Sequence, residues 1–131
     1  MIFTFNKVVI VWPMKERGEE MLSVQSDGTI KLTRGDTARL RVYINNDIDD
    51  TEYDILENDE LTFTVKKSVS DKTPYITKTI IGSNLFHIKP EDTSNLQFGN
   101  YKYDVQLTTE SGDVYTVIGP NTFEITKEVT W

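Results

Sequence analysis

The chain of 131 residues contains no cysteine and only one histidine. Disulfides, thiol nucleophiles, cysteine-ligated zinc and sites built from several histidines are therefore excluded. The sequence also lacks the glycine loops that bind phosphates and the Gly-x-Ser-x-Gly turn of serine hydrolases. Because these absences remove most recognisable catalytic constellations, we expect no enzyme activity, no cofactor and no metal site.

Long hydrophobic runs are also missing. The longest apolar run near the start covers residues 8–12, whereas a membrane-spanning helix needs about 20 residues. One lysine precedes this run, no small-residue cleavage site follows it, and Pro13 begins a charged stretch. The segment is therefore a poor secretory signal peptide, and we expect neither export by such a signal nor a membrane partner.

Positive charge is scarce. The chain has 14 Lys and Arg residues against 21 Asp and Glu residues, which gives a formal net charge of −7. Binding to nucleic-acid phosphates needs clustered Lys and Arg, so we expect no nucleic-acid partner. Residues 1–20 are neutral, and the whole net charge therefore belongs to the rest of the chain.

Residues 1–22 form an N-terminal extension with two possible interpretations. Codons for Arg17, Gly18 and Glu19 can resemble a bacterial ribosome-binding site just before Met21, which would make the segment a translated leader. Alternatively, the apolar residues from Phe3 to Trp12 form an added strand or a docking arm. Both interpretations stay open at this point.

Residues 23–131 carry the pattern of a single all-β domain. Apolar and polar side chains alternate over residues 38–44, 61–66 and 101–107, and a period of two is typical of half-buried strands. Turn signals recur every 8–12 residues, and residues 75–81 and 85–88 are predicted to form a hairpin. These features predict an antiparallel β-sandwich of about 7–9 strands, with at most one short helical turn near Pro90.

The stretch from Gly99 to Val105 makes the prediction more specific. Its spacing resembles the tyrosine corner of immunoglobulin-like domains, in which a Tyr hydroxyl donates to backbone a few residues upstream. Tyr101 would be the corner residue, and Tyr103 would occupy the position that antibody domains give to cysteine. The domain is therefore predicted to be an immunoglobulin-like β-sandwich.

Three further features have a structural explanation that we favour over a functional one. His87 lies in a predicted strand with no nucleophile pattern to serve. Residues 45–52 are rich in Asp and Asn, which are calcium-type ligands, but they also suit an ordinary turn and lack the EF-hand glycine. The integrin-binding tripeptide at residues 34–36 suits a tight turn between two strands.

Several stretches together resemble a known family. They are residues 30–37, residues 61–67 and the long segment 87–129, which includes Tyr103-Asp104-Val105-Gln106-Leu107. The chain resembles the immunoglobulin-like N-terminal domain of phage baseplate upper proteins and related small tail-module proteins from prophages of Gram-positive bacteria. The resemblance implies a virion component, located in the tail or, when expressed from a prophage, in the bacterial cytoplasm.

The leading functional prediction is a non-enzymatic structural and protein-interaction module of a phage or prophage tail or baseplate. Its partners would be other virion proteins, and self-association is plausible because such assemblies are symmetric. We expect docking by strand addition at sheet edges, and the candidate interface residues are Phe3, Phe5, Trp12, Phe123 and Trp131.

The alternative function is an immunoglobulin-like adhesion or carbohydrate-binding module. Such a module needs an exposed aromatic platform, which could be drawn from Tyr43, Tyr53, Tyr75 and Tyr115. The sequence does not show which of these tyrosines meet in the fold.

Overall fold

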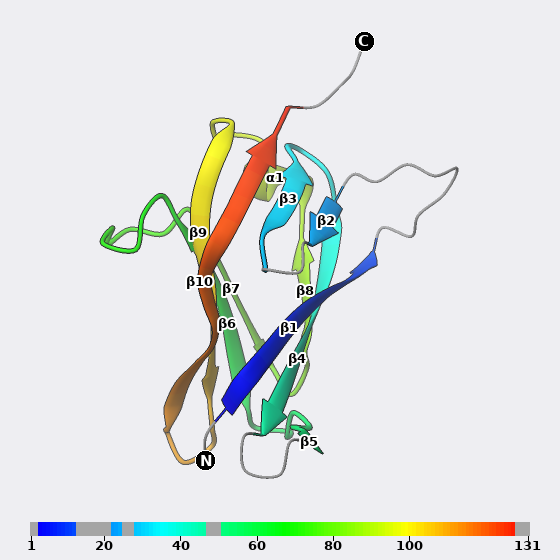
Figure 1. Ribbon diagram of the computed structural model, residues 1–131, viewed down its shortest axis with the longest axis vertical. Coiled ribbons are helices and arrows are strands. Elements are labelled where there is room, and N and C mark those ends of the chain that lie inside the picture. Colours follow the sequence, from blue (N-terminus) through cyan, green and yellow to red (C-terminus); the bar gives the residue numbers. More distant parts are fainter. Residues whose placement is uncertain (1–2, 13–21, 25–27, 47–50, 128–131) are drawn as a thin grey trace.

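The computed structural model describes the backbone of residues 3–12, 22–24, 28–46 and 51–127, and the side chains of residues 28–44 and 53–127. This part of the chain is mostly β, with a single short helix (Figure 1). Its elements are β1 (Phe3–Trp12), β2 (Leu22–Val24), β3 (Ile30–Thr33), β4 (Ala38–Asn46), β5 (Thr51–Glu52), β6 (Glu60–Lys66), β7 (Ile76–Ile81), β8 (Leu85–Ile88), α1 (Pro90–Thr93), β9 (Gly99–Thr108) and β10 (Val114–Thr126).

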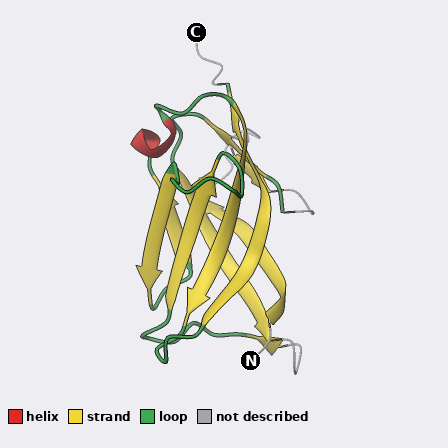
Figure 2. Ribbon diagram, turned by 90° about the vertical axis from the view of Figure 1, so that its left-hand side faces the viewer, coloured by secondary structure: helices red, strands yellow, loops and turns green. Residues whose placement is uncertain are grey.

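The strands form two hydrogen-bonded sheets. In the four-stranded sheet, β4 pairs with β1 along one side and with β8 and β5 along the other. In the six-stranded sheet the order is β2-β3-β10-β9-β6-β7. The strands run along the length of the molecule, and the helix lies at the end opposite the start of β1 (Figure 2).

One pairing departs from the antiparallel prediction. Strand β10 pairs with β3 in parallel over Phe123–Thr126, while every other ladder between described strands is antiparallel. The six-stranded sheet is therefore mixed. The two partners are nearly one hundred residues apart, so their relative direction is set by the whole topology and by no local turn.

Side chains from both sheets meet in one apolar core. The inward residues of β4 are Ala38, Leu40, Val42 and Ile44, and all four are buried, as the alternation predicts. Phe63 of β6 contacts Phe86 of β8, with ring centroids 5.6 Å apart, which joins the two sheets through aromatic packing. Phe63 also contacts Tyr103 and Phe123.

The predicted hairpin between residues 75–81 and 85–88 is wrong. Both strands exist, but β7 pairs with β6 and β8 pairs with β4, so the chain crosses from one sheet to the other at residues 82–84. Asn84 explains the crossing. Its carbonyl accepts from the N–H of Val42, its side-chain amide donates to the Val42 carbonyl, and its Oδ1 accepts from Arg41.

The hydrogen bond predicted for Tyr101 as a corner residue is present. Tyr101 lies near the start of β9, is 3% exposed, and its hydroxyl donates to the carbonyl of Gln97 four residues upstream, at 2.8 Å. Tyr103 is also buried, and its hydroxyl donates to the carbonyl of Gly28, just before β3. Tyr103 therefore links two distant segments of the chain through a hydrogen bond.

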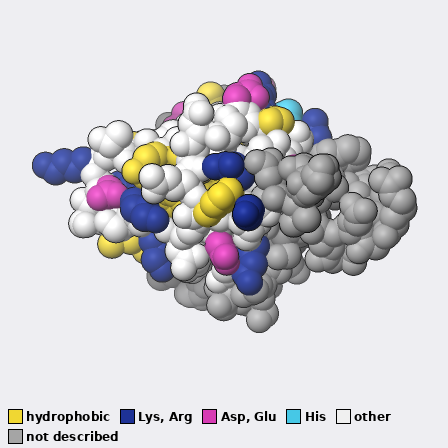
Figure 3. Space-filling view, turned by 90° about the horizontal axis from the view of Figure 1, so that it is seen from above, with side chains coloured by type: hydrophobic (Ala, Val, Ile, Leu, Met, Phe, Trp, Pro, Cys, Tyr) yellow, Lys and Arg dark blue, Asp and Glu magenta, His cyan; other side chains and the backbone are white. Residues whose placement is uncertain are grey.

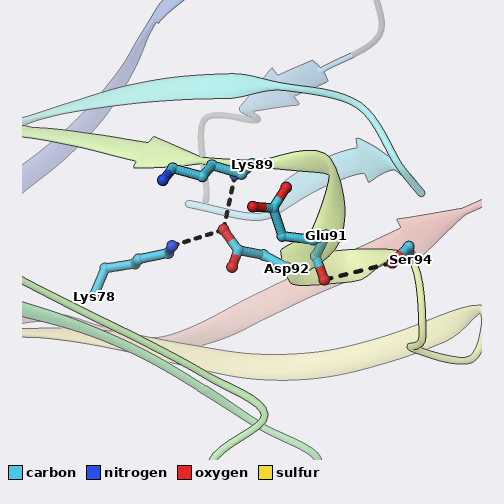
Figure 4. Close-up of polar contacts among 5 residues, drawn as sticks. All are labelled: Lys78, Lys89, Glu91, Asp92 and Ser94. Atoms are coloured by element: carbon cyan, nitrogen blue, oxygen red, sulfur yellow. Dashed lines mark hydrogen bonds and ion pairs between the residues drawn. The ribbon is translucent and has the colours of Figure 1, made fainter.

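The predicted helical turn is α1, and a charged cluster fixes it to β7 (Figure 4). The carboxylate of Asp92 accepts from the Lys89 N–H at 2.8 Å and pairs with the Lys78 ammonium at 2.8 Å. Burial alone would raise the pKa of Asp92, but the bonds from Lys78 and Lys89 outweigh it and lower that pKa below its ordinary value.

Candidate functional site

The five predicted interface residues fall into three groups: those on β1, one outside the described residues, and one in the core. Phe3, Phe5 and Trp12 belong to β1, which lies at the end of the four-stranded sheet, as the strand interpretation expects. Their side chains lie outside the described part of the chain, and so does Trp131. The backbone of β1 therefore supplies a sheet edge, while the contribution of these side chains stays a prediction.

Phe123 has a different place from the one predicted. Its side chain is 0% exposed and contacts Phe63 and Tyr103 in the core. Its strand, β10, is flanked at this point by β3 on one side and β9 on the other. The parallel partner β3 occupies the edge that the sequence had suggested for docking, so Phe123 is a core residue and not an interface residue.

The structure brings together two of the four candidate tyrosines. Tyr43 lies on β4 next to β1, and Tyr75 lies just before β7, where its ring meets Tyr101 edge-on with the ring centroids 5.5 Å apart. Tyr53 and Tyr115 instead line one depression at the end of the molecule where β4, β6 and β9 meet their loops. Of the four candidate tyrosines, Tyr53 and Tyr115 are therefore the two that share one surface and could form an aromatic platform.

We call this depression the loop-end groove. It has a volume of about 540 Å³ and lies between the segment before β6 and the turn that joins β9 to β10. Its lining residues are Tyr53, Leu56, Asn58, Asp59, Thr109, Glu110, Ser111, Asp113 and Tyr115. The volume falls within the range of roughly 300–1,000 Å³ found for small-ligand sites.

Asp59 organises one wall of the groove. It is only 1% exposed, and its carboxylate accepts hydrogen bonds from the Tyr53 hydroxyl and from the Leu56 N–H. Burial, followed by the bond to Asp59, raises the pKa of Tyr53 above the ordinary tyrosine value. Through these two hydrogen bonds the Asp59 carboxylate holds the loop before β6 in position.

The other wall is the turn between β9 and β10. Asn58 donates to the Glu110 carboxylate at 3.1 Å, which connects the two walls across the groove. Asp113 accepts from Ser111 at 3.2 Å, and both Glu110 and Asp113 are exposed. The rim is consequently acidic, while Leu56, which is 60% exposed, adds apolar surface beside it.

Two of the three features given a structural explanation, the 34–36 tripeptide and His87, lie where that explanation places them. The 34–36 tripeptide forms the turn between β3 and β4, and Arg34 lies over the Phe98 ring at 4.2 Å. His87 is exposed on β8 opposite Arg39; desolvation and then the positive charges of Arg39 and Lys89 lower the pKa of His87. Residues 47–50 of the proposed calcium loop lie outside the described residues.

Comparisons with known proteins return no relative: no protein-family model matches the chain, and no curated protein matches it significantly. None of the helices in the described ranges is long and apolar enough to cross a membrane. Within those same residues, no three His, Cys, Asp or Glu side chains gather as metal ligands would.

Sequence reasoning missed most of the groove. Leu56, Asp59, Glu110 and Asp113 lie in loops, and loop residues carry no periodicity that assigns them to a common site. One signal was present in the sequence: residues 53–60 and 109–113 each contain acids and no Lys or Arg. Their proximity follows from the adjacency of β6 and β9, which only the topology shows.

Proposed function

We propose that the protein is a non-enzymatic structural and protein-interaction module of a phage or prophage tail or baseplate, built as an immunoglobulin-like β-sandwich. The assignment to phage tails rests on the sequence resemblance described above. The assignment to an interaction module rests on the architecture, and these two parts of the proposal can be tested separately.

The strand order supports the immunoglobulin-like assignment. Immunoglobulin domains place strands C, F and G together in one sheet and strands B and E in the other. Here β6, β9 and β10 are consecutive neighbours in the six-stranded sheet, and β4 pairs with β8 in the four-stranded sheet. The corner residue Tyr101 lies near the start of β9, the strand that follows β8 and α1, and this matches the start of strand F in that scheme.

The observation that carries the interaction role is β1. It is a ten-residue strand at the end of its sheet, and it pairs with β4 over nearly its whole length. A long edge strand is a template for pairing with another chain. Strand addition at β1, by a virion protein or by a second copy of this chain, is therefore the docking mode that we propose.

Purified tail particles provide the test. Phage particles induced from the source bacterium should contain this chain, detected by mass spectrometry, in a fixed ratio to other tail proteins. Deleting the gene should yield incomplete tails. If particles from the wild-type strain lack the chain and the deletion strain assembles normal tails, the tail proposal fails. The neighbouring genes give an independent check, since tape-measure, baseplate and lysis genes are expected there.

A carbohydrate-binding module remains the second candidate because Tyr53 and Tyr115 line the same groove. Aromatic side chains combined with carboxylates suit sugar recognition as well as peptide recognition. A glycan array distinguishes the two functions: selective binding of one class of oligosaccharide, lost on substitution of Tyr115 by Ala, would favour the carbohydrate module.

A further inference from the structure

We propose that the loop-end groove binds a lysine- or arginine-containing extended segment of a partner protein, with the basic side chain seated between the aromatic wall and the acidic rim. The inference deepens the proposed interaction function and does not require that the partner be a phage protein.

The first argument is the chemistry of the lining. Tyr53, Leu56 and Tyr115 supply apolar and aromatic surface, while the exposed Glu110 and Asp113 supply carboxylates at the rim. Lysine and arginine side chains combine an apolar stem with a cationic head. Such a side chain can lay its stem on Leu56 and the rings, and place its charge near the rim.

The second argument is the charge of the loops around the groove. Residues 53–60, 82–84 and 109–113 contain six acidic residues and no Lys or Arg. These segments are joined by hydrogen bonds, from Asn58 to Glu110 and from the Gly82 N–H to the Asp59 carbonyl. One positive charge joins these segments, because Arg41 donates to Asn84. A cationic partner is therefore attracted, and an anionic one is repelled.

The third argument is the contrast with the opposite end of the molecule. The segments there, residues 34–37, 67–75 and 89–98, contain four basic and four acidic residues. Viewed from that end, Lys and Arg side chains are spread among hydrophobic and acidic ones (Figure 3). Among these segments of the described chain, the excess negative charge lies at the groove end, which orients an approaching basic segment toward it.

The chain already uses the same recognition chemistry within its own fold. Arg34 lies 4.2 Å from the centre of the Phe98 ring, and Lys67 lies 4.5 Å from that of Tyr101. Both contacts place a cation over an aromatic face, which is favourable in an exposed setting. The groove offers this arrangement to a side chain from outside, with carboxylates added.

The charge also separates this proposal from sugar binding. Carboxylates can accept hydrogen bonds from sugar hydroxyls, but a neutral sugar gains no charge attraction from them, whereas a guanidinium or ammonium group does. Binding of a basic segment should therefore weaken with salt, because exposed charge pairs are screened at a Debye length of about 8 Å at physiological ionic strength. Binding of a neutral oligosaccharide should be insensitive to salt.

The experiment uses two fluorescent peptides, one with several arginines and one with glutamine at those positions. Binding to the full chain is measured by anisotropy, and the site is mapped by backbone amide chemical shifts. The arginine peptide should bind and shift the amides of Leu56, Asn58 and Tyr115. The variant Glu110→Gln/Asp113→Asn should bind about tenfold more weakly, since each rim charge contributes roughly threefold.

A matched control removes two charges from the opposite end. Glu91→Gln/Asp71→Asn has the same net charge as the rim variant, and its affinity should equal that of the wild type. Leu56→Ala tests the apolar part and should weaken binding without altering the salt dependence. Leu56 is 60% exposed, so the substitution leaves the core intact.

Four results would overturn the inference. The glutamine peptide could bind as well as the arginine peptide, or both charge variants could weaken binding equally, which would indicate attraction by net charge alone. Alternatively, an oligosaccharide could shift the groove amides while the arginine peptide does not. If no peptide binds but the chain is found in tail particles, the groove proposal fails while the proposed function stands.

Discussion

Replacing Tyr101 with phenylalanine tests whether the tyrosine corner stabilises the domain. The substitution removes one hydroxyl, whose hydrogen bond to the Gln97 carbonyl is 2.8 Å long, and keeps the ring. The ring contacts with Tyr75 and Lys67 therefore persist. The measured change isolates the hydrogen bond that ties the start of β9 to the segment after α1.

The expected loss is about 1 kcal/mol in the free energy of unfolding. A typical intramolecular hydrogen bond contributes roughly 0.5–1.5 kcal/mol, and an acceptor left buried without a partner costs roughly 1–3 kcal/mol. The Gln97 side chain is exposed, so water can reach the orphaned carbonyl. The loss should therefore stay near the hydrogen-bond value and should not approach the larger penalty.

Urea unfolding of the wild type, Tyr101→Phe and Tyr43→Phe measures this loss. Tyr43 is the matched control because its hydroxyl has no hydrogen bond among the described residues. Tyr101→Phe should lower the unfolding midpoint with an unchanged dependence on urea, while Tyr43→Phe should leave it within about 0.3 kcal/mol of wild type. Equal stabilities for the two variants would refute the structural role assigned to the corner.

Three other predictions address different parts of the fold. Asp92→Asn should lower stability near neutral pH by roughly 0.5–1 kcal/mol through loss of the Lys78 pair. Because the folded pKa of Asp92 is lowered, this stabilisation is present above the ordinary pKa of 3.8 and is lost as the pH falls through the folded pKa. Unfolding measured at a series of pH values should therefore show the stability difference between the wild type and Asp92→Asn disappear in acid. Gly119→Ala should destabilise by more than about 2 kcal/mol, since its Cβ would lie 2.5 Å from a backbone carbonyl of β9, whereas Gly112→Ala, with nothing within 4 Å, should cost less in thermal melts. Phe63→Ala should cost about 3–5 kcal/mol because the side chain is buried against three other aromatic rings, and a loss under 1 kcal/mol would contradict that packing.

The sequence predicted the local structure well because local structure here depends on alternation. The inward residues of β4, β6 and β9 are the apolar ones at every second position, and all of those described are buried. The corner at Tyr101 was also predictable, because its hydrogen bond reaches only four residues upstream. Patterns that act over a few residues are readable in the chain itself.

Long-range relations were not predictable in the same way. The parallel pairing of β3 with β10 and the crossing at Asn84 depend on partners far away in the sequence. The burial of Phe123 follows from that parallel partner, and alternation alone does not reveal which edge a neighbour will cover. The loop-end groove likewise forms because the loops at residues 53–60 and 109–113 are adjacent. The sequence shows that both loops are acidic, but it does not show that they form one site.

The directions of β1 and β10 have a mechanical consequence. β1 begins at the groove end of the molecule, and β10 finishes at the opposite end (Figure 1). A force that pulls these two strands outward along the long axis slides each of them past its partner, β4 or β3. The backbone hydrogen bonds between β1 and β4 and between β10 and β3 then bear the force together, instead of breaking one at a time. This geometry resists stretching, a useful property in any assembly that transmits load along a chain of subunits.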